Sequence, residues 1–181
     1  MKRGFFLLAS ALILSPLLPA QTGPGGFPEP EAEFAGIRLG DDIGTVKKNL
    51  PGNPYFRYRG ERDVSFLPRR PETVIDCAGS YQVKRGLFQF HQDRLYILTL
   101  YLDPEKVDYY SLSTGLSRKY GPPADLDPSG AVWESETLRL SLEKPLTVKY
   151  VDRGTFASIR AAGAAEKSVE DMSRARFLDL F

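Results

Sequence analysis

The sequence contains one cysteine and one histidine, Cys77 and His91. Zinc sites are built mainly from several Cys and His ligands, and a Ser-His-Asp or Cys-His arrangement would have to use His91. His91 falls in a predicted turn, where a histidine is typically solvated. No glycine-rich phosphate loop is present. The sequence therefore predicts no catalytic residues, no metal ligands and no cofactor, and hence a protein that is not an enzyme.

Carboxylates are the remaining groups that could catalyse a reaction. A pair of Asp or Glu side chains hydrolyses glycosidic bonds when the fold brings the two together. The acids nearest the predicted strand ends are Asp41, Asp42, Asp76 and Glu134. These acids are spread along the chain, and the sequence does not say whether the fold brings two of them together. A carboxylate-based hydrolase of envelope glycan therefore remains an alternative.

The single cysteine has no intramolecular disulfide partner, so Cys77 is predicted to be unpaired. In an exported protein such a residue can be a reactive thiol or form an intermolecular bridge. Val74 and Ile75 precede it, and free cysteines are usually buried. We therefore expect a buried, apolar Cys77.

One segment alternates aromatic and basic residues and predicts a binding surface. Aromatic faces beside guanidinium groups bind glycans, anionic lipid headgroups or protein partners. The alternative is a half-buried strand whose aromatic side chains point inward and whose arginines point outward. The candidate binding residues are Tyr55, Arg57, Tyr58, Arg59, Arg62, Arg69 and Arg70.

The N-terminus has the pattern of a secretory signal peptide. Met1-Lys2-Arg3 is basic, an apolar stretch follows from Phe5 to Leu14, and Ala20 suits a cleavage site. The stretch is shorter than the roughly 20 residues that span a bilayer. We expect a signal peptide over residues 1–20 and a periplasmic or secreted protein without a transmembrane span after cleavage. A retained N-terminal anchor is the alternative.

The composition is that of a globular protein, with 42% hydrophobic and 26% charged residues. Without Lys2 and Arg3, 22 basic and 23 acidic residues remain, a net charge of −1. This balance argues against a nucleic-acid partner, because nucleic-acid binders usually carry a basic excess.

The elements that must position these residues begin after a Gly- and Pro-rich leader over residues 21–35. Residues 37–39 predict a short strand, and Asp41 or Asp42 caps a helix that carries Ile43, Val46 and Leu50. Short strands follow over 55–58 and 64–67. A hairpin of strands 81–90 and 95–102 is joined by the four residues 91–94. Strand 95–102 is apolar on both faces, which predicts a central position.

A second helix is predicted from Asp103 as N-cap, with Pro104 in the first turn, to Gly121. Its apolar stripe consists of Tyr109, Leu112, Leu116 and Tyr120. The acidic segment 125–127 is predicted to be a loop. Strands follow over 131–135, 137–143 and 146–150, and residues 156–181 predict a helical tail.

A helix followed by strands thus occurs twice. We predict an α+β fold, with an antiparallel meander sheet, helices packed on one side and a C-terminal helix. The predicted domain covers residues 36–153, with halves 36–102 and 103–153 sharing a sheet, and the tail covers 154–181.

These elements resemble small bacterial envelope domains of the BamE/SmpA type. The likeness rests on the glycine-bounded start at 36–40, the hairpin segment 88–95 and the helix exit at 116–122. Two such units in tandem resemble secreted β-lactamase-inhibitor proteins. The lipidated cysteine of the envelope lipoproteins is missing, and the first turn reads Pro51-Gly52-Asn53-Pro54. The resemblance implies binding or scaffolding and transfers no functional residue.

The sequence thus predicts an exported, non-catalytic binding or scaffold module. Its partner is a protein or an envelope component such as a glycan or an anionic lipid headgroup. Two alternatives remain, the glycan hydrolase and a proteinaceous inhibitor of an exported enzyme.

Overall fold

The computed structural model describes residues 32–67 and 72–178. The predicted signal peptide, 1–20, lies outside these residues. The strands are β1 (Glu33–Phe34), β2 (Ile37–Arg38), β3 (Phe56–Arg57), β4 (Val64–Leu67), β5 (Glu72–Gly79), β6 (Val83–His91), β7 (Arg94–Leu102), β8 (Asp125–Asp127), β9 (Gly130–Glu134), β10 (Leu138–Glu143) and β11 (Thr147–Asp152). The helices are α1 (Ile43–Asn49), the 3₁₀ helix η1 (Gly60–Asp63), α2 (Tyr109–Tyr120) and α3 (Arg153–Leu178).

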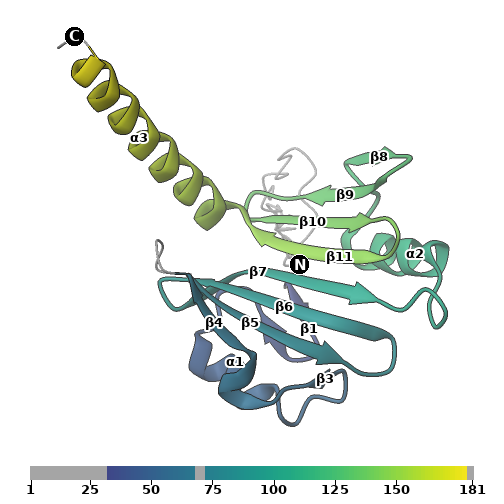
Figure 1. The fold of residues 1–181 in the computed structure, drawn as a ribbon. Coiled ribbons are helices and arrows are strands. Elements are labelled where there is room, and N and C mark those ends of the chain that lie inside the picture. Colours follow the sequence, from purple (N-terminus) through teal and green to yellow (C-terminus); the bar gives the residue numbers. More distant parts are fainter. Residues whose placement is uncertain (1–31, 68–71, 179–181) are drawn as a thin grey trace, which may run out of the picture.

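The architecture is an antiparallel nine-stranded sheet with helices, which confirms the predicted α+β class (Figure 1). The strand order is β3-β5-β6-β7-β11-β10-β9-β8, with β4 also paired to β5, and β1 and β2 form a separate two-stranded sheet. Strand β7 lies at the centre between β6 and β11, as its two apolar faces predict.

The sheet is made of two halves that meet at β7 and β11. In each half a helix precedes the strands, and the strands then follow chain order from the outer edge to the centre. The last strands of the two halves, β7 and β11, pair antiparallel from Thr147↔Tyr101 to Val151↔Ile97. The order of the strands in the two halves is therefore related by an approximate two-fold axis between β7 and β11.

Helices α1 and α2 cover the same face of the sheet. Val46 of α1, its C-cap residue Leu50, and Leu116 and Tyr120 of α2 belong to one buried cluster together with Phe88 of β6. Asp42 caps α1 by accepting hydrogen bonds from the amide and hydroxyl of Thr45, each 2.8 Å long. One continuous core therefore joins the halves, with both helices on one side as predicted.

The C-terminal helix α3 makes a small contact with the opposite face. Ile159 packs against Tyr96, Ile97 and Val151. Beyond this contact α3 projects away from the sheet (Figure 1), and its described side chains from residue 164 onward are exposed.

Helix α2 begins later than predicted. Asp103 instead closes a turn, since its carbonyl accepts from the amides of Lys106 (3.0 Å) and Val107 (3.1 Å). The N-cap of α2 is Asp108, whose carboxylate accepts from the Ser111 amide at 2.8 Å. Two aspartates offer the same capping chemistry here, and the sequence pattern favoured the wrong one.

The central hairpin turn is shorter than the predicted four residues. His91 pairs with Arg94, so only Gln92 and Asp93 form the turn, with φ of 47° and 64°. Two positive φ values are typical of the type I′ turn, which Asn-Gly normally marks. Gln-Asp lacks that signal, and the turn length was therefore missed.

Three strands were also missed. Glu33–Phe34, assigned to the leader, form β1, and the segment 125–127, predicted to be a loop, forms edge strand β8. The long strand β5 contains Asp76, Ala78 and Gly79, which are residue types that strands disfavour. Pairing with β4 on one side and β6 on the other stabilises it nevertheless.

Candidate functional site

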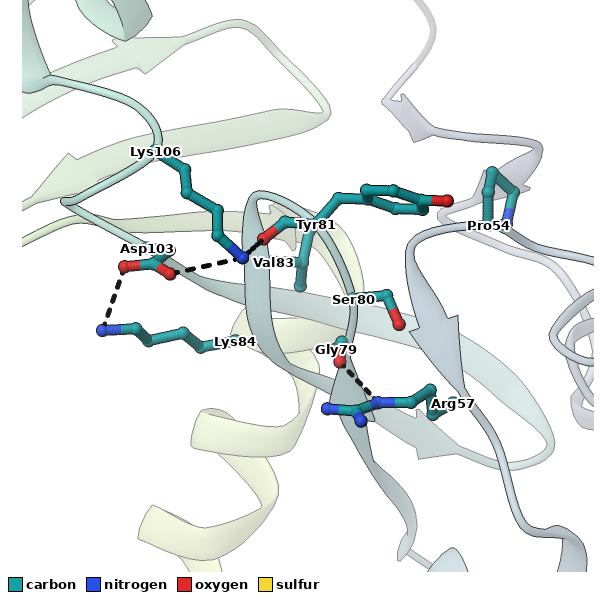
Figure 2. A pocket seen from close by; sticks show the side chains of 9 residues that line it. All are labelled: Pro54, Arg57, Gly79, Ser80, Tyr81, Val83, Lys84, Asp103 and Lys106. Atoms are coloured by element: carbon teal, nitrogen blue, oxygen red, sulfur yellow. Dashed lines mark hydrogen bonds and ion pairs between the residues drawn. The ribbon is translucent and has the colours of Figure 1, made fainter.

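A cavity of about 650 Å³ opens where two segments of the first half meet the start of the second half (Figure 2). The first-half segments are β3 with the residues before it and the turn from β5 to β6, and the second-half segment is the chain after β7. The lining residues are Pro54, Arg57, Gly79, Ser80, Tyr81, Val83, Lys84, Asp103 and Lys106.

Backbone hydrogen bonds tie these segments together. The Ser80 amide donates to the Tyr55 carbonyl at 2.9 Å, which joins the turn to β3. The Asp103 amide donates to the Gln82 carbonyl at 2.8 Å, which joins the same turn to the chain after β7. The turn between β5 and β6 is therefore fixed by hydrogen bonds to both of the other segments that form the cavity.

The turn presents Tyr81 at the rim of the cavity. The Val83 amide donates to the Ser80 carbonyl at 3.0 Å, and Tyr81 has a φ of 55°. A bulky residue in this left-handed region is uncommon and strained, and such residues are concentrated at functional sites. Tyr81 is 65% exposed and lies beside Pro54 (Figure 2).

A bulge aims Lys84 at the cavity. Val83 pairs with Leu102 and Arg85 with Tyr101, so Lys84 has no partner across the strand pair. Bulges redirect side chains in this way, often next to binding sites. The Lys84 ammonium lies 3.2 Å from Oδ1 of Asp103 (Figure 2).

The other two cations that line the cavity are Lys106, from the chain after β7, and Arg57, from β3. Lys106 Nζ donates to the Tyr81 carbonyl at 2.8 Å and lies 3.7 Å from Oδ2 of Asp103. Arg57 Nε donates to the Gly79 carbonyl at 2.9 Å. Within residues 32–67 and 72–178, no carboxylate forms an ion pair with Arg57.

The cavity is positively charged. Burial alone would raise the pKa of Asp103, but the Glu105 amide, Lys84 and Lys106 outweigh that effect and lower the pKa, so the carboxylate is ionised. Three cations and one anion leave a net charge of +2. The arrangement attracts anions and provides separate donors for them.

Among the predicted binding residues, Arg57 lines the cavity. Tyr55 and Tyr58 pack against the hydrophobic core, and burial raises the pKa of Tyr58. Arg59 is bonded through Nε and Nη2 to the buried Asp63, at 2.8 and 2.7 Å.

Of the remaining candidates, Arg62 is exposed on η1, and Arg69 and Arg70 lie outside the described residues. Sequence reasoning missed Tyr81, Lys84 and Lys106. They are distant from Arg57 in the sequence, and no local pattern connects them to it.

Cys77 and His91 lie away from this cavity. Cys77 is fully buried in the core, and burial, with Asp63 and Asp76 nearby, raises the pKa of its thiol to about 12. The thiol is therefore protonated at neutral pH, as expected for a buried cysteine. His91 ends β6, with its ring 6.2 Å from that of Tyr96.

The four acids noted in the sequence each have a partner. Asp42 caps α1 and Asp41 accepts from the Arg38 amide. Asp76 pairs with Arg85 and Glu134 with Arg139.

Among the described residues, no group of three or more His, Cys, Asp or Glu side chains is placed to hold a metal ion. No helix among these residues combines the length and apolar character needed to cross a bilayer.

The comparisons with known proteins identify a domain family. The family model described as the TP0088 domain matches residues 32–162, which include the whole sheet and every residue that lines the cavity. No curated protein and no solved structure matches the chain. The resemblance to BamE/SmpA-type domains stays a prediction. On the extent of the family match, the chain belongs to the TP0088 domain family.

Proposed function

We propose that this protein is an exported, non-catalytic binding module that holds an anionic component of the cell envelope in the cavity around Arg57. The observation that carries the proposal is the cavity's charge: its lining contains three cations, Arg57, Lys84 and Lys106, and a single carboxylate, Asp103, which pairs with the two lysines. Because the backbone hydrogen bonds join the three wall segments, the site is largely preformed, and a preformed site loses less entropy when it binds a ligand.

Export is part of the same proposal and rests on the sequence. The basic start, the apolar stretch from Phe5 to Leu14 and the small residue Ala20 favour a cleaved signal peptide. The protein would then act in the periplasm or the surrounding medium, where envelope glycans and lipid headgroups are accessible.

The two alternatives have less support. A glycan hydrolase needs two free carboxylates facing each other, whereas Asp41, Asp42, Asp76 and Glu134 have partners in caps, turns and ion pairs. An inhibitor would favour a broad exposed aromatic surface. Among the described residues, the most exposed aromatic residues, Phe66, Tyr81 and Tyr110, lie apart in the fold, on β4, on the turn between β5 and β6, and on α2.

The proposal is tested by cosedimentation of the purified protein with isolated bacterial envelope. The double variant Arg57→Gln/Lys84→Gln should bind at least about tenfold more weakly, because two charge-assisted contacts are lost. Arg62→Gln is the matched control, since it removes an exposed arginine of the predicted patch that does not line the cavity. Wild-type affinity in the double variant would contradict the proposal.

Export is tested by locating the expressed protein in the cell. When the full chain is expressed in a Gram-negative host, the protein should be recovered from the periplasm or the medium without residues 1–20. Recovery of the intact chain from the cytoplasm would contradict the export part of the proposal.

A further inference from the structure

We infer that the cavity is a site for a phosphate monoester carried on a ring, such as a sugar phosphate. This inference rests on the proposed function and names the chemical class of its ligand. The ligand is either a phosphorylated lipid headgroup or a soluble phosphate ester, since both present the same phosphoryl group.

Charge favours phosphate over carboxylate. A phosphate monoester carries about −1.5 to −2 charges at pH 7 and has three terminal acceptor oxygens. The cavity has a net charge of +2, and its three cations come from β3, β6 and the chain after β7. A carboxylate would compensate only half of that charge and has only two oxygens to accept hydrogen bonds.

Arg57 is oriented for a two-oxygen contact. Its Nε is bonded to the Gly79 carbonyl, which holds the guanidinium at the cavity wall. The two terminal nitrogens can then donate in parallel to two phosphate oxygens. Lys84 and Lys106 line another part of the same cavity, where each is paired with Asp103 (Figure 2).

The size and the rim favour a ligand larger than phosphate. A volume of about 650 Å³ is within the range of roughly 300–1,000 Å³ that is typical of small-molecule sites. Tyr81 and Pro54 form an apolar edge, and the strained turn holds the Tyr81 ring exposed. A flat aromatic face beside the charged groups suits contact with the C–H face of a sugar ring.

The test is calorimetric titration of the full exported chain with glucose 6-phosphate, inorganic phosphate, glucuronate and glucose. Glucose 6-phosphate should bind at least tenfold more tightly than glucuronate, and glucose should not bind. Arg57→Lys keeps the charge but removes the guanidinium fork, so it should weaken glucose 6-phosphate binding about tenfold. Tyr81→Ala should weaken glucose 6-phosphate more than inorganic phosphate, and Arg62→Gln should change neither.

Affinity should fall when the pH is lowered from 7 to 5. The phosphate monoester has its second pKa near about 6 and loses one negative charge in this range. The groups that face it are the cations Arg57, Lys84 and Lys106 and the carboxylate of Asp103, which stays ionised. Glucuronate affinity should stay nearly constant over the same range, which makes it an internal control.

Vesicles separate the two sources of the phosphoryl group. Cosedimentation with phosphatidylcholine vesicles that contain phosphatidylinositol 4-phosphate, which carries a phosphate monoester on an inositol ring, but not with pure phosphatidylcholine, supports a lipid headgroup. Binding of glucose 6-phosphate without vesicle binding supports a soluble ester.

Two results would overturn the inference, and they differ in what they imply for the proposed function. If envelope binding depends on Arg57 but glucuronate equals or exceeds glucose 6-phosphate, the phosphate class is wrong and the proposed function stands. If neither envelope nor phosphate esters bind, both proposals fail.

Discussion

At the scale of single residues, Gly86 shows how closely the first half is packed. A Cβ at this position would lie 2.5 Å from Cε1 of Phe56 and 3.1 Å from Cε2 of Phe88. The Phe56 ring cannot easily move away, because it is buried and in edge contact with Phe34 and Phe88. Glycine is therefore required here for space, not for backbone conformation.

Substitution of this glycine should destabilise the fold. Gly86→Ala should lower the free energy of unfolding by about 1–3 kcal/mol, the usual cost of overpacking a core. Gly115→Ala is the matched control, since a Cβ there meets nothing within 4 Å on the exposed surface of α2. That variant should be stabilised by up to about 1 kcal/mol through helix propensity. Urea unfolding monitored by circular dichroism measures both, and equal effects would contradict the packing argument.

At the scale of elements, α3 differs from the other helices. Helices α1 and α2 contribute buried side chains to the core, whereas α3 contacts the sheet through Ile159. The family match ends at residue 162, in the first part of α3. The rest of this helix therefore adds little to the stability of the domain.

Truncation tests this view. A chain that ends at Ala162 should unfold within about 0.5 kcal/mol of the full chain, because exposed residues away from packed contacts contribute little. Ile159→Ala should cost about 1 kcal/mol, since it removes apolar contact with Tyr96, Ile97 and Val151. Thermal unfolding measures both changes. A truncation that costs more than Ile159→Ala would show that the distal helix stabilises the fold.

At the scale of the whole molecule, the two halves share one sheet and one core. The β7–β11 pairing crosses the boundary between them, and the main buried cluster contains residues of both halves. Separation of the halves would expose this cluster to water, which is unfavourable. The domain is therefore expected to unfold as one cooperative unit.

Two natural probes measure that cooperativity. Trp133 is the only tryptophan and lies in the second half, whereas Cys77 is the only cysteine and lies buried in the first. Trp133 fluorescence and thiol labelling of Cys77 should give the same urea midpoint, as a two-state transition requires. Before that midpoint Cys77 should resist labelling at pH 8, because burial raises the pKa of its thiol to about 12. Separate midpoints would mean that the halves unfold independently.

The sequence by itself determined the features that depend on neighbours along the chain. The start of α1 at an aspartate, Asp41 or Asp42, the stripe of Leu116 and Tyr120 on α2, and the alternation of buried leucines in β10 all follow from local periodicity and capping chemistry. These local signals were sufficient to predict the α+β class and the repeat of helix and strands.

Only the tertiary structure decided the features that depend on contacts between distant segments. Strand β5 forms because β4 and β6 pair with it, although its own residues favour a strand only weakly. The lining of the cavity includes Arg57, Lys84 and Lys106, which come from three segments. Its shape depends on a bulge and a strained turn that no local sequence pattern predicts. The physical reason is that a strand pair and a site are defined by long-range contacts, whose partners the sequence order does not specify.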